Sequence, residues 1–194
     1  QGWRRIKGTV LSEVSYFQAL STDRSAWGKA VAEVDVSSAR AVAYLWHFMS
    51  YARTKSRDGS DALLNTVVEV PNSNSIYQIR EVKIPLVANR VFASKWTWRR
   101  EPNNDFVIAM TALKDLAWSA DKLKVQNLIN AEKNADNAVM GELRGCYRLS
   151  QLTDNVCRVT LIGQRCVQRG ERASGASTRK AAAATTLFVG GVAR

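Results

Sequence analysis

The succession of β-like segments constrains the fold of this chain more than any other feature. Six segments with strand-like composition follow one another, at residues 63–70, 75–84, 90–100, 106–113, 143–152 and 155–168. Turn-forming residues separate neighbouring segments at 71–74, 101–104 and 153–154, which is typical of hairpin connections. The sequence therefore predicts an antiparallel meander.

A strand followed by an amphipathic helix precedes the meander. In residues 27–36, apolar and polar side chains alternate with a period of two, and Glu33 and Asp35 share the polar side. Ser37 and Ser38 then offer hydroxyl groups of the kind that cap a helix N-terminus. The apolar residues behind them fall on one helical face: Val42, Leu45, Trp46, Met49 and Ala52. We expect this face to pack against the sheet.

Two further segments have local signals of their own. A short surface helix is predicted at residues 119–134, capped by the serine at its first position, with Leu123, Leu128 and Ile129 as its apolar residues. Residues 3–16 mix apolar with charged positions, so that a helix and an edge strand both remain open.

The length of the chain favours one domain and a tail. A chain of 194 residues is long enough for a single domain with a sizeable core. We place this domain at residues 1–168. From Arg169 the composition changes to alanine, glycine, serine and arginine, which predicts a flexible basic tail over 169–194 or a weak terminal helix over 178–189.

The net charge of +11 favours contact with phosphates, either of nucleic acid or of anionic lipid headgroups. The basic residues occur in twos and threes, whereas a dedicated nucleic-acid binder usually gathers them into a stripe. The three cysteines, Cys146, Cys157 and Cys166, form no C-x-x-C pair, so that neither a disulfide framework nor a zinc site is indicated. We therefore expect a reducing, cytoplasmic location, and no apolar run approaches the ~20 residues of a membrane span.

Catalytic patterns are missing from the sequence. His47 is the one histidine, so that any serine or cysteine triad would have to use it. There is no G-x-S-x-G, no Walker loop, no dinucleotide-binding fingerprint and no H-E-x-x-H. The cysteines also lack companion histidines for a metal. We expect a protein that is not an enzyme and that holds no metal or cofactor.

The order of several motifs resembles the START-domain family. Residues 76–85 form a strand ending in proline, a short loop leads to Asn89, Arg90 and Phe92, and residues 95–98 carry Trp96 and Trp98. Residues 146–149 and 154–164 are similar to the last two strands of the family, so that the resemblance spans roughly residues 25–168. It implies an α+β helix-grip fold, in which a curved antiparallel sheet wraps around helices and encloses an internal cavity for one lipid or sterol.

The resemblance also implies site residues. It places the following residues at cavity-lining positions: Glu69, Asn89, Arg90 and Met110. Trp96 and Trp98 share one strand face and are expected in the core or the cavity wall. An apolar cavity needs a few convergent polar groups to orient its ligand, and a buried Arg90 would need an acidic partner, for which Glu69 is the candidate. The alternative is that Arg90 lies on the surface at a strand end.

Three functions are compatible with these patterns. The first is lipid or sterol binding for transfer or sensing, with the basic surplus serving contact with an anionic membrane surface. The alternative is a basic nucleic-acid-binding module whose six tryptophans stack on unpaired bases. The third is an interaction domain within a larger signalling chain. The identity of the lipid and the oligomeric state remain open.

Overall fold

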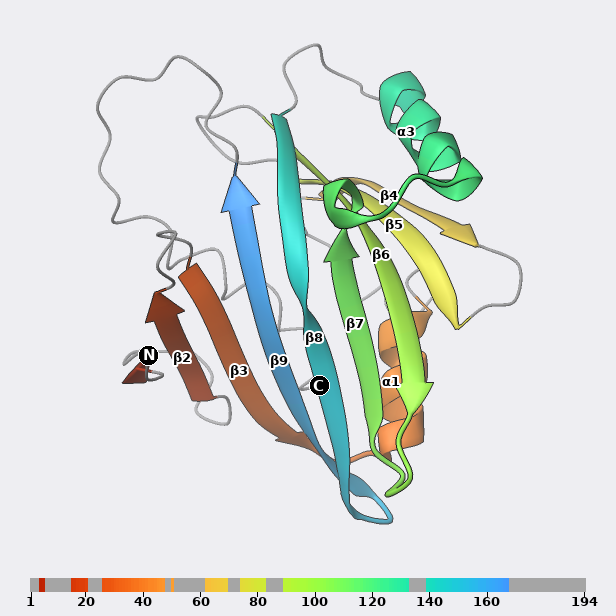
Figure 1. The fold of residues 1–194 in the computed structure, drawn as a ribbon. Coiled ribbons are helices and arrows are strands. Elements are labelled where there is room, and N and C mark those ends of the chain that lie inside the picture. Colours follow the sequence, from red (N-terminus) through yellow and green to blue (C-terminus); the bar gives the residue numbers. More distant parts are fainter. Residues whose placement is uncertain are drawn as a thin grey trace.

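The computed structural model describes residues 4–5, 15–20, 26–47, 50, 62–69, 74–82, 89–132 and 139–167. Within these residues, nine strands form one sheet in the order β1-β2-β3-β9-β8-β7-β6-β5-β4 (Figure 1). The strands are β1 Arg4–Arg5, β2 Ser15–Leu20, β3 Ala26–Val34, β4 Ala62–Glu69, β5 Ser75–Val82, β6 Arg90–Arg100, β7 Phe106–Ala112, β8 Val139–Thr153 and β9 Val156–Val167. The helices are α1 Ser38–Trp46 and α3 Ala120–Glu132, with a short 3-10 turn, η1, at Leu113–Asp115.

The sheet contains the predicted antiparallel meander together with further strand pairings. Neighbours from β4 to β9 follow the order of the chain, and β3 joins this run by pairing with β9. The first part of β8 also pairs in parallel with β6, where Arg90 lies opposite Val139 and Phe92 opposite Gly141. The region that the sequence left open, residues 3–16, contributes β1 and the start of β2 to the described sheet.

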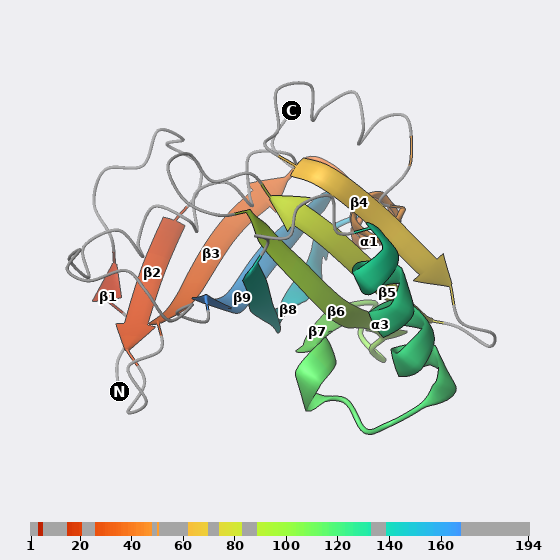
Figure 2. The same cartoon turned by 90° about the horizontal axis from the view of Figure 1, so that it is seen from above.

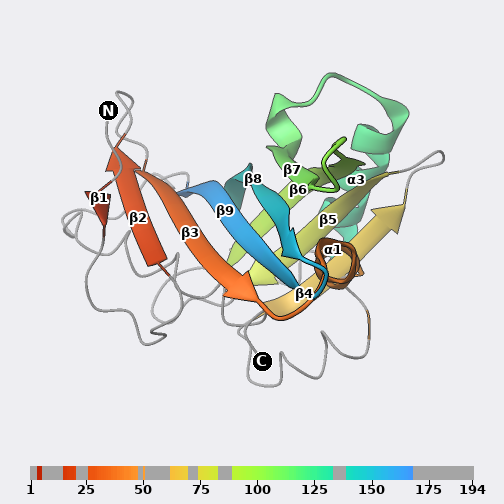
Figure 3. The same cartoon turned by 90° about the horizontal axis from the view of Figure 1, so that it is seen from below.

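The curvature of the sheet creates two faces with different partners. The sheet bends around α1, whereas α3 lies outside the bend (Figures 2 and 3). Alternation along β6 shows the division: Phe92 and Trp96 belong to the core beneath α1, and Val91 and Ala93 to the core beneath α3. We call the face toward α1 the inner face and the face toward α3 the outer face. The predicted α+β architecture is confirmed, with a single described helix inside the bend.

Helix α1 is positioned by its cap and by its apolar residues. The Ser37 hydroxyl accepts a hydrogen bond from the Arg40 backbone N–H at 3.4 Å, as an N-cap should. Leu45 is buried, and the ring of Trp46 packs edge-on against Trp98 at 6.4 Å. The helix ends at Trp46, earlier than the periodicity predicted, and the predicted positions Met49 and Ala52 lie outside the described residues.

The lower end of the sheet, where the β6–β7 and β8–β9 hairpins turn, is fastened to α1. The Ser38 N–H donates to the Gln151 side chain at 2.7 Å, and the Ser38 hydroxyl donates to the Asn104 carbonyl at 3.1 Å. These bonds satisfy donors at the start of the helix that have no partner within it. Both hairpins and α1 are therefore held in one arrangement.

Helix α3 begins directly after the predicted cap, Ser119, and packs on the outer face through one side. Val125 and Ile129 are fully buried beneath it, whereas Leu123 is 42% exposed. Val125 and Ile129 are four residues apart and share one helical face, and Leu123 points away from that face because each residue advances the helix by about 100°. Of the three apolar residues named from the sequence, Leu128 and Ile129 therefore pack on the outer core, and Leu123 does not.

Candidate functional site

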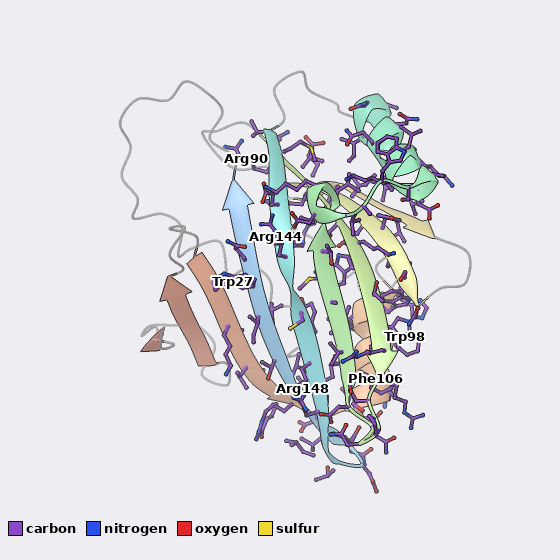
Figure 4. All side chains as sticks on the ribbon, viewed as in Figure 1. Trp27, Arg90, Trp98, Phe106, Arg144 and Arg148 are labelled. Atoms are coloured by element: carbon purple, nitrogen blue, oxygen red, sulfur yellow. The ribbon has the colours of Figure 1, made fainter. Side chains whose placement is uncertain are left out.

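The inner face brings together three of the predicted site residues. Trp96 and Met110 lie directly opposite each other on β6 and β7 and are 1% and 3% exposed. Trp98 follows on the same face, with its ring 6.1 Å from that of Phe106 (Figure 4). Because Trp46 of α1 also packs against Trp98, these side chains form the wall between the sheet and the helix.

A few polar groups are embedded in this apolar wall. The Trp96 indole N–H donates to the Ser94 hydroxyl at 2.9 Å. Ser94 lies opposite Gln78 of β5, and both are buried, at 1% and 5% exposure. Sequence reasoning missed them, although Gln78 follows Ile76 by two residues and therefore shares its inward side.

Two arginines extend the polar row toward the upper end of the sheet, where β6 begins. The alternation that turns Phe92 inward places Arg90 on the inner face as well, and Arg80 lies opposite Phe92 on β5. Arg90 is half-buried and labelled at the upper end in Figure 4, and one of its terminal N–H groups donates to the carbonyl of Asn89 at 3.4 Å.

The expected pairing of Glu69 with Arg90 is wrong. Glu69 pairs in register with Ile76 of β5, whereas Arg90 pairs with Val82 of the same strand. These two positions on β5 are six residues apart, or about 20 Å along the strand. Glu69 therefore lies toward the opposite end of the sheet, and the strand register separates two residues that the family resemblance had joined.

Asn89 instead holds a carboxylate that sequence reasoning did not single out. Its side-chain amide donates to one oxygen of Glu81 at 2.8 Å, and its carbonyl accepts from the Val139 N–H at 2.9 Å. Glu81 is 1% exposed and alternates outward with Ile79, into the core beneath α3. Its second oxygen is buried without a hydrogen-bond partner among the described residues. Asn89 thus ties the start of β6 to both neighbouring strands.

A band without side chains crosses the inner face beside Met110. Gly28 of β3 lies opposite Gly163 of β9, Gly163 opposite Gly145 of β8, and Gly145 opposite Met110. All three glycines alternate with residues of the inner core, such as Leu161. The band therefore presents no side chain on the inner face of three adjacent strands.

The hollow that the described residues outline, about 340 Å³ in volume, lies on the other face of the sheet. Trp27, Cys146 and Ile162 line it together with Arg144, all at positions that alternate with residues of the inner core. Figure 4 labels Trp27 and Arg144. The Arg144 guanidinium donates to Asp115 and holds the pKa of that carboxyl below its ordinary value. The charge of Arg144 is therefore compensated by Asp115 at the rim of the hollow.

The described thiols are poorly suited to nucleophilic chemistry. Burial raises the pKa of the Cys146 thiol and of the Cys157 thiol, so that both are protonated near neutral pH. His47 is exposed at the end of α1. In the part of the chain that the structure describes, no three metal-ligating side chains gather.

Several solved structures share this arrangement. The human StarD13 (DLC2) lipid transfer and protein localization domain matches with a TM-score of 0.69 at 14% identity, covering 99% of this chain and 86% of that one. The chain has a START-like fold. Human StAR-related lipid transfer protein 5 matches the START-like domain with a TM-score of 0.62 at 9% identity, covering 94% of this chain and 78% of that one.

Human STARD10 matches with a TM-score of 0.64 at 15% identity and covers 88% of the START-like domain, which spans 63% of the STARD10 chain. No family model and no curated protein sequence matches the chain. The similarity to these structures therefore lies in the backbone arrangement, the helix-grip fold, and not in the sequence. No helix among the described residues is long and apolar enough to cross a bilayer.

Proposed function

We propose that this START-like domain binds one lipid or sterol against the inner face of its sheet and serves lipid transfer or sensing without catalysing a reaction. The observation that carries the proposal is the composition of that face. Phe92, Trp96 and Met110 are buried and apolar, and Ser94 and Gln78 are the polar exceptions among them. A largely apolar lining with a few placed polar groups is typical of sites for small apolar ligands.

The glycine band supports the same proposal. Gly28, Gly163 and Gly145 remove three adjacent side chains beside Met110. An acyl chain or a sterol ring system requires an elongated apolar surface, and a row of glycines places no polar side chain on it. We propose that the apolar part of the ligand lies along this band.

Arg90 gives the proposed site a direction. It lies with Arg80 at the upper end of the inner face, away from the tryptophans near α1. A guanidinium group stays charged at any physiological pH and matches phosphate and carboxylate oxygens with two parallel hydrogen bonds. We propose that the polar headgroup or hydroxyl of the ligand lies toward Arg90 and its apolar part toward Trp96.

The basic surplus is better explained by membrane contact than by nucleic acid. Among the described residues, Arg99, Arg144, Arg148 and Arg158 each form an ion pair with a carboxylate. Such pairing is not the unbroken basic stripe that nucleic-acid binding requires. We propose peripheral contact with an anionic membrane surface, and a cytoplasmic location in keeping with the free thiols of Cys146 and Cys157.

Native mass spectrometry of the protein purified from cells, followed by lipid extraction, tests the proposal. We expect one bound lipid or sterol per chain. Arg90→Leu should lower the loaded fraction, whereas Arg99→Leu is the matched control, because the Arg99 side chain is 73% exposed and pairs with Glu101 at the surface. Protein that is consistently empty, and that takes up no lipid on incubation with extracted lipids, would contradict the function.

A further inference from the structure

The link between η1 and α3 exposes a tryptophan. Trp118 is 75% exposed, which is the highest exposed fraction among the large apolar side chains of the described residues. It lies between the end of η1 at Asp115 and the start of α3 at Ala120. Exposing so large an apolar ring to water is unfavourable, because burial of apolar surface lowers the free energy of a protein in water. A partner that covers the ring would remove this cost.

Hydrogen bonds hold the link in the conformation that exposes Trp118. The Ser119 hydroxyl accepts from the Lys122 N–H at 3.1 Å, which caps α3 directly after Trp118. The Lys122 ammonium group donates to the Leu116 carbonyl at 2.7 Å, and Leu116 packs on the outer core. These hydrogen bonds thus fix the backbone on both sides of Trp118, and they hold the turn that carries the indole ring.

Other exposed apolar residues lie close to Trp118 in the chain. Ala117 and Ala120 flank it, and Leu123 follows one helical turn later at 42% exposure. Lys124 is exposed beside them. We define these four apolar residues, Ala117, Trp118, Ala120 and Leu123, as the Trp118 platform.

We propose that the Trp118 platform is the element by which this domain docks on an anionic bilayer. An indole ring combines a large apolar area with one N–H donor and is therefore favoured at the level of the lipid headgroups. Lys124 is exposed and can approach lipid phosphates as the ring enters, contributing about 1 kcal/mol near an anionic surface. Of the nearby carboxylates, Asp115 is compensated by Arg144.

The size of the platform favours a bilayer over a protein partner. A stable protein–protein interface buries at least about 1,000 Å² with a packed apolar centre. The platform offers one tryptophan, one leucine and two alanines, which is too small for such a centre. A bilayer needs no complementary shape, so that insertion of Trp118 and Leu123 suffices for reversible attachment.

The location of the platform connects it with the proposed ligand site, and to this extent the inference rests on the proposed function. The link that carries Trp118 leaves the sheet where β7 ends at Ala112, opposite Ser94 and four residues along β6 from Arg90, in the upper half of Figure 1. Arg90 lies at the same end (Figure 4). Docking through Trp118 therefore brings the Arg90 end of the inner face toward the bilayer, from which a headgroup would enter.

Flotation with phosphatidylcholine vesicles, with and without phosphatidylserine, tests the docking surface on the full chain. We expect binding to the vesicles that contain phosphatidylserine, and a decrease of about tenfold in the partition coefficient for Trp118→Ser. Leu123→Ser should weaken binding in the same direction. The matched control is Leu152→Ser, because Leu152 is also 42% exposed but lies in the β8–β9 hairpin at the lower end.

Loading measured by native mass spectrometry separates this inference from the proposed function. Trp118→Ser protein that binds vesicles as well as the wild type overturns the platform. Loss of vesicle binding together with loss of preloaded lipid also overturns it, because the effect then acts through the interior. Wild-type protein that is empty of lipid but docks through Trp118 contradicts the proposed function and leaves the platform standing.

Discussion

Gly145 of β8 and Gly163 of β9 lie directly opposite each other, yet only Gly163 has room for a side chain. Gly145 has a φ of 154°, and a Cβ atom there would lie 2.7 Å from the Cα of Gly163. At Gly163 a Cβ atom would meet the Arg144 carbonyl at 3.4 Å and Leu161 at 4.0 Å, which are ordinary contacts. The close approach of β8 to β9 therefore depends on Gly145, whereas Gly163 leaves space free.

Alanine at these two positions should have unequal effects on stability. Gly145→Ala forces a Cβ atom against the β9 backbone and strains φ, and we expect it to lower the free energy of unfolding by about 2–3 kcal/mol. Gly163→Ala should change it by less than about 1 kcal/mol. Urea denaturation of both variants measures the difference. Equal destabilisation would show that the two positions are equally confined.

A large side chain at Gly163 should displace the proposed ligand. Leu161, the neighbour of a Cβ atom at this position, belongs to the inner core, so that the ring of Gly163→Phe would project along the glycine band. We expect a several-fold lower lipid content by native mass spectrometry, with the protein still folded. Ala109→Phe is the control, because Ala109 is exposed on the outer side of β7. Undiminished loading would remove the band from the proposed site.

Strand order was predictable from the sequence because the strands alternate cleanly and turn residues bound them. The bounds of β6 match the predicted segment at both ends, since a run of alternating residues is followed by the 101–104 turn. Trp96 and Trp98 were correctly placed on one face for the same reason. Alternation within a strand is a local property, and local composition reveals it.

Contacts between strands were less predictable, because they depend on register. Glu69 was assigned to Arg90 from position in a family pattern, and the register carries the two to different parts of the sheet. The buried Glu81 was not singled out from the sequence, because nothing there showed that α3 would cover its side of the strand. Tertiary packing decides whether a helix covers one face of a strand, and it leaves little trace in the local sequence.

Removing the amide of Asn89 should destabilise the start of β6. Asn89→Ala takes away the hydrogen bond to Glu81, whose carboxylate is 1% exposed, and we expect a loss of about 1–3 kcal/mol in the free energy of unfolding. The control is Asn74→Ala, which removes an exposed bond of 2.7 Å to the Trp98 carbonyl. The double variant Asn89→Ala, Glu81→Leu should recover part of the loss. A double variant no more stable than Asn89→Ala would contradict this account.

The stability of the domain should fall in acid partly through Asp105. Burial by itself raises the pKa of Asp105, but hydrogen bonds from Arg148, Ser150 and the Gln151 N–H outweigh it and lower the pKa from the ordinary 3.8. A carboxyl with a depressed folded pKa adds stability above its unfolded pKa, and this stability is lost as the pH falls through the folded value.

Asp105→Asn should therefore destabilise the protein at pH 7, and its difference from the wild type should shrink below pH of about 4. Urea titrations at pH 7 and at a pH below about 4 measure the effect, with the exposed Asp154→Asn as control. A difference between wild type and Asp105→Asn that is the same at both pH values would exclude a role for ionised Asp105 in fastening the hairpins.

The direct pairing of β8 with β6 has a consequence for how this domain can change over evolution. Between Ala112 and Val139 the chain leaves the sheet, yet β6 and β8 meet behind the excursion, and the ring of Phe92 covers Gly141 there. The hydrogen-bonded framework is complete without the residues in between. Residues of this segment that do not pack on the outer core, such as Trp118, can therefore be exchanged, and the surface that meets a partner can diversify while the scaffold stays the same.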